Sequence, residues 1–382
     1  MNKNILKTND NTQDKNKFCI IISTIHLIMK KLILFISTLL FLIGCQNVSE
    51  QHPIKNVDLK GEVVLSDSML GISSPVYIQV VDTMWVTVNL QGDTLVDVWG
   101  ASSRKRLNSF IAKGDGPLEF RRIDSFRADE KTQSLYMYDI YKRRLFKVAY
   151  SDLLQPKPAV QEVFSWNLED NTPFSLMGTV RADNYFIATN ITDTASYVVK
   201  EPDGNIKAIG KFPDKNHVDP AMTNMCNATL YDLTMTVAPD NQKIAVSCHL
   251  ADMLQIIKVD KGRFPIQTEI NAYPNDIYLM PTGDGEMQGL VTAKTKRYYI
   301  GIAATDDYIY AIWHGDVLPE GNKGYLNSSL VRVFNWEGKE CYQLHLDRSI
   351  FYLTVTPDNK TLMALTDKGE GISVLKYEMD LP

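Results

Sequence analysis

The sequence predicts an all-β fold for the chain after about residue 57, on the basis of two observations. Short alternating segments rich in Val, Ile, Tyr, Phe and Thr follow one another, at 77–81, 85–90, 135–138, 185–189 and 244–247. Asp-Asn, Asp-Gly and Gly-Asp turns separate such segments at hairpin spacing, and the 3.6-residue periodicity of amphipathic helices is scarce. This pattern is typical of antiparallel strands joined by tight turns.

An internal repeat narrows the fold class. Residues 236–246 (TVAPDNQKIAV) align without gaps with residues 354–364 (TVTPDNKTLMA), and looser copies begin at residues 126, 180 and 304, with the weakest at 80. The turns of these copies fall at residues 82, 129, 183, 240, 306 and 358, at intervals of 47 to 66 residues. Six units of four short strands predict a six-bladed β-propeller, in which radial repetition protects the sheet edges.

The propeller ring must close, and the last unit shows only three strands, near 351–356, 361–366 and 372–377. We therefore expect the otherwise unassigned segment at about 57–66 to supply the missing outer strand of the last blade. A two-domain sandwich is disfavoured because no Pro-, Ser- or Gly-rich linker divides the chain. Parallel α/β folds would require helices where the sequence has polar turns.

The N-terminal region carries the features of a secretory signal. Lys30-Lys31 precedes twelve apolar or small residues, 32–43, which are followed by Gly44-Cys45. Such a helix would span about 18 Å, less than the ~30 Å of a hydrocarbon core. The sequence Leu-Ile-Gly-Cys resembles the lipobox of bacterial lipoproteins, which implies a diacylglycerol on Cys45.

A second apolar run, 18–28, precedes Lys30, so a membrane hairpin or one long anchor is the alternative. We favour Met29 as the start, which predicts four segments. These are an upstream extension at 1–28, a lipoprotein signal peptide at 29–44, a tether at 45–56 and the propeller at 57–382. The expected location is the cell envelope, lipid-anchored to the outer membrane through Cys45.

Charge and cysteine content exclude several classes of function. Residues 1–44 carry six Lys and two Asp, so a chain beginning at Cys45 would have a net charge of −9 instead of −5. An acidic chain with scattered Lys and Arg lacks the basic stripe that nucleic-acid binding requires. Five cysteines do not make a disulfide framework. Cys226 and Cys248 could pair, although a buried Cys248 thiol is the favoured interpretation.

Three blocks resemble a family of secreted Bacteroidetes proteins, the TolB-like six-bladed propeller lipoproteins. They are RYYIGIAATDDYIYAIWHG at 297–315, VRVFNWEGK at 331–339 and KGDGPLEF at 113–120. In the last block, Leu118 replaces the second glycine of the family's Gly-Pro-Gly-Glu-Phe loop. The resemblance implies the propeller fold and an envelope location, and it carries no agreed catalytic residues.

Motifs for chemistry are weak. The 113–120 loop has two glycines but lacks the Gly-Lys-Ser/Thr ending and the helix of a phosphate cradle, so we predict that Gly114 and Gly116 adopt positive φ and that Phe120 anchors the next blade. Gly283-Asp-Gly-Glu286 lacks the spacing of a calcium loop, which leaves calcium as a minor alternative to no cofactor at all. No His-x-x-x-His, Cys-x-x-Cys or Gly-x-Ser-x-Gly occurs.

The first binding candidate is the long loop that begins at Trp313-His314-Gly315-Asp316, because function concentrates in loops on rigid scaffolds. The structural alternative is that Trp313 merely caps a blade. Asn190, Asp193 and Asn227 lie near predicted strand ends and are further candidates. We expect a non-catalytic binding or scaffolding module for a protein, peptide or glycan. The alternative is a metal-dependent hydrolase or lyase with its site in the central channel.

Overall fold

Antiparallel strands make up nearly all of the regular structure between residues 54 and 382. The computed structural model describes residues 29–31, 53–71, 73–166, 176–190, 195–212, 231–274, 278–281, 287–318, 326–367, 369 and 371–381. Within these residues, none of the helices has the length and apolar character needed to cross a membrane. Residues 54–382 form one compact unit, to which the following description refers.

The first four blades each contain four antiparallel strands in chain order. Blade 1 consists of β3 (Pro75–Val81), β4 (Met84–Asn89), β5 (Thr94–Gly100) and β6 (Arg106–Ala112). Blade 2 consists of β7 (Ser125–Asp129), β8 (Ser134–Asp139), β9 (Arg144–Ala149) and β10 (Gln161–Ser165), with the 3-10 helix η1 (Tyr150–Asp152) before β10. Blade 3 consists of β11 (Leu176–Ala182), β12 (Tyr185–Asn190), β13 (Tyr197–Lys200) and β14 (Ile206–Ile209). Blade 4 consists of β15 (Leu233–Val237), β16 (Lys243–Cys248), β17 (Ala251–Lys258) and β18 (Ile266–Pro274).

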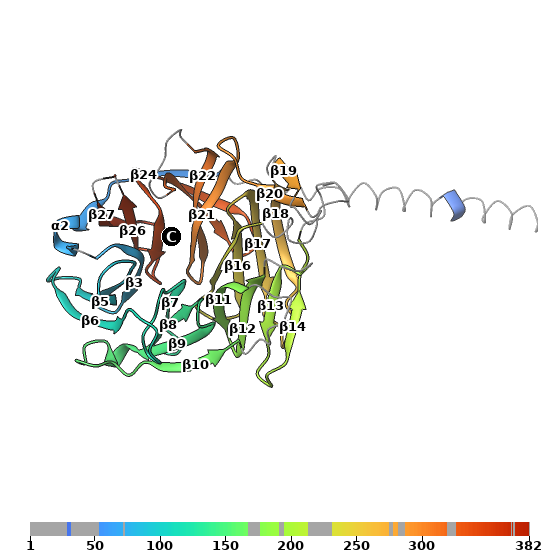
Figure 1. Cartoon of the computed structure of the whole chain (residues 1–382). Coiled ribbons are helices and arrows are strands. Elements are labelled where there is room, and N and C mark those ends of the chain that lie inside the picture. Colours follow the sequence, from blue (N-terminus) through green and yellow to red (C-terminus); the bar gives the residue numbers. More distant parts are fainter. Residues whose placement is uncertain are drawn as a thin grey trace, which may run out of the picture. The chain divides into compact units, whose positions relative to one another are not determined.

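The last two blades include strands from the N-terminal side of the propeller. Blade 5 consists of β21 (Lys296–Ala304), β22 (Tyr308–Val317), β23 (Ser328–Asn335) and β24 (Glu340–Ile350). Blade 6 consists of β25 (Tyr352–Val355), β26 (Thr361–Asp367) and β27 (Ile372–Glu378). A two-stranded hairpin of β19 (Tyr278–Pro281) and β20 (Met287–Leu290) lies between blades 4 and 5 in the sequence. The first strands of consecutive blades contact one another in a closed circle, which confirms the predicted six-bladed propeller (Figure 1).

The ring closes as predicted, but through two strands instead of one. β2 (Glu62–Leu65) pairs with β27 as the outer strand of blade 6. β1 (Lys55–Leu59) instead pairs in parallel with β24 and becomes a fifth strand of blade 5. Gly61 lies between β1 and β2 and permits the chain to pass from blade 5 to blade 6, because a Cβ there would lie 2.6 Å from the ring of Tyr377. The short helix α2 (Asp67–Leu70) then leads toward blade 1.

The turns between the first two strands of several blades explain the sequence repeat. Asp82, Asp183, Asn241 and Asn359 all have positive φ, between 50° and 62°. Asp and Asn tolerate this left-handed conformation better than other non-glycine residues, because their short side chains bond to nearby backbone groups. The repeated Asp-Asn sequences therefore mark equivalent hairpin turns at one end of the propeller.

The hydrophobic core is divided among the spaces between blades. Six clusters of buried apolar side chains each join two consecutive blades of the described structure. Phe120 is fully buried in the cluster between blades 1 and 2, with its ring 4.5 Å from that of Phe146, so its predicted role as an anchor is confirmed. Leu65 lies in the cluster between blades 6 and 1, together with Trp85 and Trp99. The ring therefore depends on β2 for packing as well as for strand pairing.

Candidate functional site

A cavity of about 560 Å³ runs along the propeller axis, and all six first strands contribute to its wall. One lining residue from each is Gln79, Arg127, Val180, Thr236, Gly301 and Thr354. Because first strands of all blades run in the same direction, the cavity has two distinct ends. The first-turn end carries the hairpin turns described above, and the crossover end is where the chain passes from each blade to the next.

At the first-turn end, side chains bridge the blades. Arg127 of blade 2 donates hydrogen bonds to the carbonyl of Arg181 (3.0 Å), the Oδ1 of Asn241 (3.1 Å) and the carbonyl of Ala238 (3.3 Å). Burial lowers the pKa of the Arg127 guanidinium, which the nearby Asp129 opposes. Three acceptors from two other blades thus hold one cationic side chain at this end of the axis.

Bonds between blades also line the cavity from its middle to the crossover end. Gln79 of blade 1 donates to the Tyr352 hydroxyl (3.1 Å) and accepts from the Thr354 hydroxyl (3.4 Å). The Tyr77 hydroxyl donates to the carbonyl of Asp124 (2.9 Å), and burial raises the pKa of Tyr77 to about 12. These contacts fix the wall in place before any ligand arrives.

Polar side chains line the crossover end of the axial cavity, and not all of their hydrogen-bonding groups have partners among the described residues. Thr189, at the end of β12, is 2% exposed, and its Oγ1 has no hydrogen-bond partner among the described residues. Asp232 lines the same end from blade 4, and Asp124 from blade 2. Burial raises the pKa of Asp124 and outweighs the opposing effect of Arg122, whose Nε lies 2.6 Å from Asp124 Oδ1.

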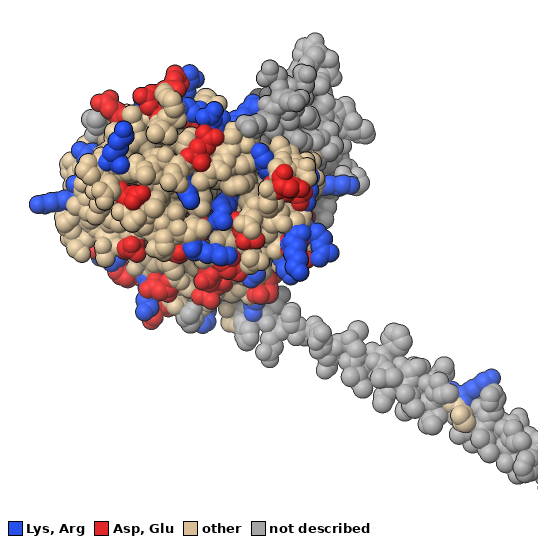
Figure 2. Space-filling model, turned by 90° about the horizontal axis from the view of Figure 1, so that it is seen from below, with Lys and Arg blue, Asp and Glu red and all other residues tan. Residues whose placement is uncertain are grey.

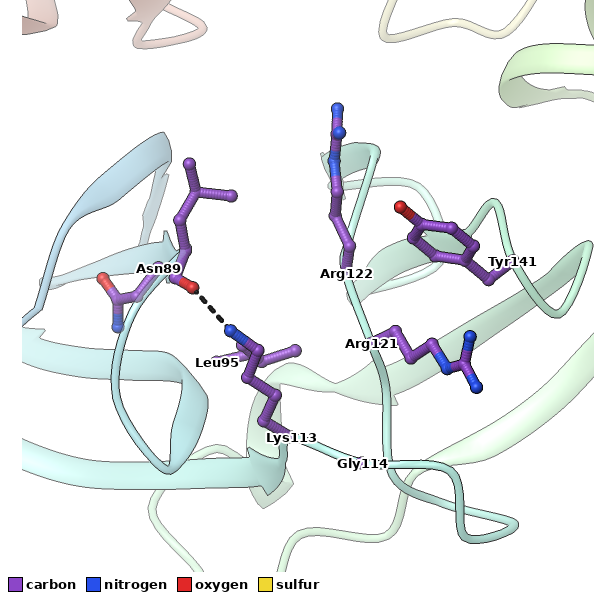
Figure 3. A pocket seen from close by; sticks show the side chains of 8 residues that line it. Asn89, Leu95, Lys113, Gly114, Arg121, Arg122 and Tyr141 are labelled. Atoms are coloured by element: carbon purple, nitrogen blue, oxygen red, sulfur yellow. Dashed lines mark hydrogen bonds between the residues drawn. The ribbon is translucent and has the colours of Figure 1, made fainter.

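A second cavity of about 500 Å³ lies beside the crossover end, between blades 1 and 2 (Figure 3). We call it the side pocket. Its lining residues are Asn89, Leu90, Leu95, Lys113, Gly114, Arg121, Arg122 and Tyr141. Leu90 and Arg122 also line the axial cavity, so the two cavities adjoin. Lys113 Nζ donates to the carbonyl of Leu90 at 3.0 Å, drawn as the dashed line in Figure 3.

The glycines of the 113–120 loop act differently from the prediction. Neither Gly114 nor Gly116 has positive φ. Instead, a Cβ on Gly114 would lie 2.1 Å from Glu119 Oε2, and a Cβ on Gly116 would lie 2.9 Å from Glu119 Cδ. Glu119 folds back over the loop, where its Oε2 accepts the Gly116 N–H at 2.8 Å. Both glycines therefore leave the space that the Glu119 carboxylate occupies.

Residues 313–316, which the sequence predicts to begin a long loop, belong instead to strand β22, so the predicted start of the loop was wrong, and Trp313 has a structural role. Trp313 is half-buried, with the guanidinium of Arg332 at 4.7 Å from its ring and the Tyr299 ring at 5.0 Å. This cluster lies between blades 4 and 5. His314 is half-buried and Asp316 exposed, and the Asp316 N–H donates to His314 Nδ1 at 3.2 Å. Gly315 at positive φ makes this geometry attainable, since a Cβ there would lie 2.5 Å from the Trp313 Nε1.

Asn190 also has a role in maintaining the fold. It is 1% exposed, and its Nδ2 donates to the carbonyl of Ala195, before β13, at 3.1 Å. Cys45, Asp193, Asn227, Cys226 and the 283–286 loop lie outside the described residues. Cys248 is fully buried, as favoured, and burial raises the pKa of its thiol to about 12.

The imidazole of His249 responds to side chains from blades 4 and 5. Burial lowers the pKa of His249, Asp232 acts against that shift, and Arg297 and His314 add to it. His314 and Asp232 thus act on the same imidazole from blades 5 and 4. The sequence could not reveal this arrangement, because the three residues share no motif.

The face drawn in Figure 2 carries charges of both signs, and the described residues include no metal-ligand set. Figure 2 shows Lys and Arg interspersed with Asp and Glu over the coloured residues of one face. Among the residues that the structure describes, no group of three or more His, Cys, Asp or Glu side chains could hold a metal ion. The sequence did not predict Arg122, Tyr141 or Thr189 as cavity-lining residues.

Comparisons with known proteins agree with this architecture. A family model described as TolB-like 6-blade propeller-like matches residues 55–358. A solved structure of a member of the DUF4221 family from Bacteroides vulgatus is similar, with 11% identity and a TM-score of 0.51, over 85% of this chain and 97% of that one. A candidate exported protein from Bacteroides fragilis has 10% identity and a TM-score of 0.52, over 86% of this chain and 100% of that one. A comparison with curated proteins found no sequence match. Because the family model spans most of the sequence, the chain belongs to the TolB-like 6-blade propeller-like family.

Proposed function

We propose that the protein is a non-catalytic binding module, lipid-anchored through Cys45 to the outer membrane of the cell envelope. Its ligand, a protein, peptide or glycan, enters the axial cavity from the crossover end. The anchor rests on the signal and lipobox at residues 29–45. The similarity to the candidate exported protein from Bacteroides fragilis is compatible with this location.

The proposed location of the binding site rests on the difference between the two ends of the axial cavity. Arg127 and its partners occupy the first-turn end. At the crossover end, the Thr189 hydroxyl is buried without a partner in the described structure. A buried polar group without a hydrogen bond costs free energy, and a ligand that supplies the bond recovers it. A preformed cavity lined by apolar surface and a few such groups is typical of a ligand site.

The alternative function, a metal-dependent hydrolase or lyase, would require different residues around the same cavity. It requires several ligating side chains from different blades around the axis. The described carboxylates at the crossover end, Asp124 and Asp232, come from blades 2 and 4. Asp124 is already paired with Arg122, and this reduces its capacity to hold a cation. We therefore favour binding over catalysis.

Thr189→Val tests this proposal, because valine keeps the shape of threonine and removes only the hydroxyl. A panel of peptides and oligosaccharides would first be screened against soluble Cys45→Ala protein by calorimetry. A ligand of the axial cavity should bind Thr189→Val about 5- to 10-fold more weakly, in line with one lost hydrogen bond of about 1 to 1.5 kcal/mol. The matched control is Thr268→Val, on the outer strand β18 of blade 4.

The ligand recovered after incubation decides between the two functions. An intact ligand, with or without added divalent cations, supports a binding module. Cleavage that depends on a divalent cation and is lost in Thr189→Val would establish the hydrolase instead. Equal affinities of the Thr189→Val and Thr268→Val proteins would show that the ligand does not use the axial cavity.

A further inference from the structure

All the charged residues that line the side pocket are cationic. Lys113, Arg121 and Arg122 line it, and no Asp or Glu does. The carboxylates that pair with the two arginines, Asp115 and Asp124, lie outside the lining. In Figure 3, Lys113 lies on one side of the opening, and Arg121, Arg122 and Tyr141 lie on the other. An anion between the two sides would therefore meet positive charge from both.

Lys113 and Arg122 retain hydrogen-bond donors for a ligand. An ammonium group has three donors, and Lys113 uses one of them for the carbonyl of Leu90. Arg122 contacts Asp124 through Nε, and its side chain is 53% exposed, so its terminal nitrogens face solvent. Arg121 is less available, because its guanidinium forms a two-point contact with Asp115. Lys113 and Arg122 are thus the residues that can donate hydrogen bonds to an oxyanion.

Tyr141 adds a flat apolar surface on the same side as Arg121. Tyr141 is 61% exposed, and the Arg121 guanidinium lies 5.9 Å from its ring centroid. The turn that carries Tyr141 is rigid, since Asp139 Oδ1 accepts the N–H groups of Tyr141 (2.9 Å) and Lys142 (3.0 Å). Solvent exposure of such a large ring on a fixed turn costs hydrophobic free energy that a stacked ligand would recover.

The remainder of the side pocket is also held in position. Lys142 Nζ donates to the carbonyls of Gly116 and Glu119, both at 2.5 Å, and so ties the Tyr141 turn to the 113–120 loop. Leu95, which is buried, adds an apolar surface. Two cationic groups with unused donors, an exposed ring and an apolar surface match a ligand that has a carboxylate next to a flat apolar face.

We propose that the side pocket binds an acidic saccharide, with its carboxylate between Lys113 and Arg122 and a sugar ring against Tyr141. This inference rests on the proposed binding function and assigns a ligand class to a site beside the axial cavity. A pyranose offers the flat C–H face that packs on an aromatic ring, and a hexuronate carries its carboxylate on that same ring. An acidic peptide supplies the charge but not the rigid flat face.

Calorimetry with trigalacturonate tests the proposal, using Cys45→Ala protein as the soluble parent. The methyl-esterified trimer is the matched neutral ligand, and triglutamate is the matched acidic peptide. Lys113→Gln and Arg122→Gln should each weaken trigalacturonate binding by about 10-fold or more, because hydrogen bonds to charged groups contribute about 1.5 to 3 kcal/mol. Tyr141→Ala should weaken it by about 5-fold, as expected for a lost aromatic contact of about 1 kcal/mol.

Arg144→Gln is the control variant, because Arg144 is an exposed, ion-paired arginine on the β9 strand of the same blade. It should bind trigalacturonate like the parent. Thermal unfolding of each variant checks the fold, and Tyr141→Ala keeps the test decisive if Arg122→Gln proves unstable. The proposal is overturned if trigalacturonate does not bind, if the methyl ester binds equally well, or if triglutamate binds equally well with the same variant dependence. If trigalacturonate fails while another ligand still depends on Thr189, the proposed function stands and this inference alone fails.

Discussion

Replacement of Leu65 by alanine measures how much the N-terminal strand β2 contributes to the closed ring. Leu65 is 0% exposed and pairs with Val374 of β27. It packs in the cluster that contains Trp85 and Trp99 of blade 1. Leu→Ala substitutions at buried sites cost about 2 to 5 kcal/mol, and the cost is higher where the surroundings cannot collapse. Two large indole rings anchored in β4 and β5 limit collapse, so we expect a loss of about 3 to 4 kcal/mol.

Urea unfolding followed by fluorescence and by circular dichroism provides the assay. Leu118→Ala serves as the exposed control, since Leu118 is 52% exposed, and should change the free energy of unfolding by less than about 0.5 kcal/mol. Leu135→Ala, at a fully buried site in blade 2, serves as the internal reference. If the ring unfolds as one cooperative unit, Leu65→Ala and Leu135→Ala should cost similar amounts. A Leu65→Ala loss as small as that of Leu118→Ala would show that β2 does not close the ring.

Two further predictions concern the anchor and pH. Cys45→Ala should abolish labelling by a fatty-acid probe and release the protein from membranes; membrane retention of the variant would support the alternative hairpin at residues 18–43. Stability should fall as the pH drops from 7 through 6.5 toward 5, because burial lowers the pKa of His249 and the unfolded chain then binds a proton that the folded chain resists. His249→Asn should show a smaller loss between pH 7 and pH 5 in urea unfolding, whereas an unchanged loss would assign the pH dependence to other groups.

Most of the fold was predictable because it depends on local signals. The Asp-Asn turns repeat, and the hydrophobic alternation between them reports which face of each strand is buried. The strand that closes blade 6 was also predictable, since a three-stranded last unit in a closed ring implies a donor elsewhere in the chain. The division of the 57–66 segment into two strands was not predictable from the sequence. It depends on the contact of Gly61 with the ring of Tyr377, 316 residues away in the sequence.

The candidate site was less predictable, because its residues are adjacent in space and unremarkable in sequence. Thr189 resembles any β-branched residue at a strand end, and only the axial cavity shows that its hydroxyl lacks a partner. The sequence predicts that Trp313 begins a long binding loop, but Trp313 lies within β22, and Arg332 from the next strand covers its ring. The 113–120 loop has the predicted structural role through Phe120, but nothing in its sequence distinguishes Lys113 as a lining residue of the side pocket.

The repeated Asp-Asn turn also explains why the two ends of the propeller differ. Asn241 and Asn359 occupy equivalent positions in the aligned repeats, and both are buried. Asn241 Oδ1 accepts from Arg127 of blade 2, and Asn359 Oδ1 accepts from the hydroxyls of Thr305 (2.6 Å) and Tyr310 (3.0 Å) of blade 5. The same residue therefore sets the turn through its backbone and joins blades through its side chain. Bonds between blades also occur toward the crossover end, where the Tyr77 hydroxyl of blade 1 donates to the carbonyl of Asp124 before blade 2. The two ends of the propeller therefore join the blades through different residues: turn asparagines at the first-turn end, and side chains of the first strands and crossover segments toward the other end.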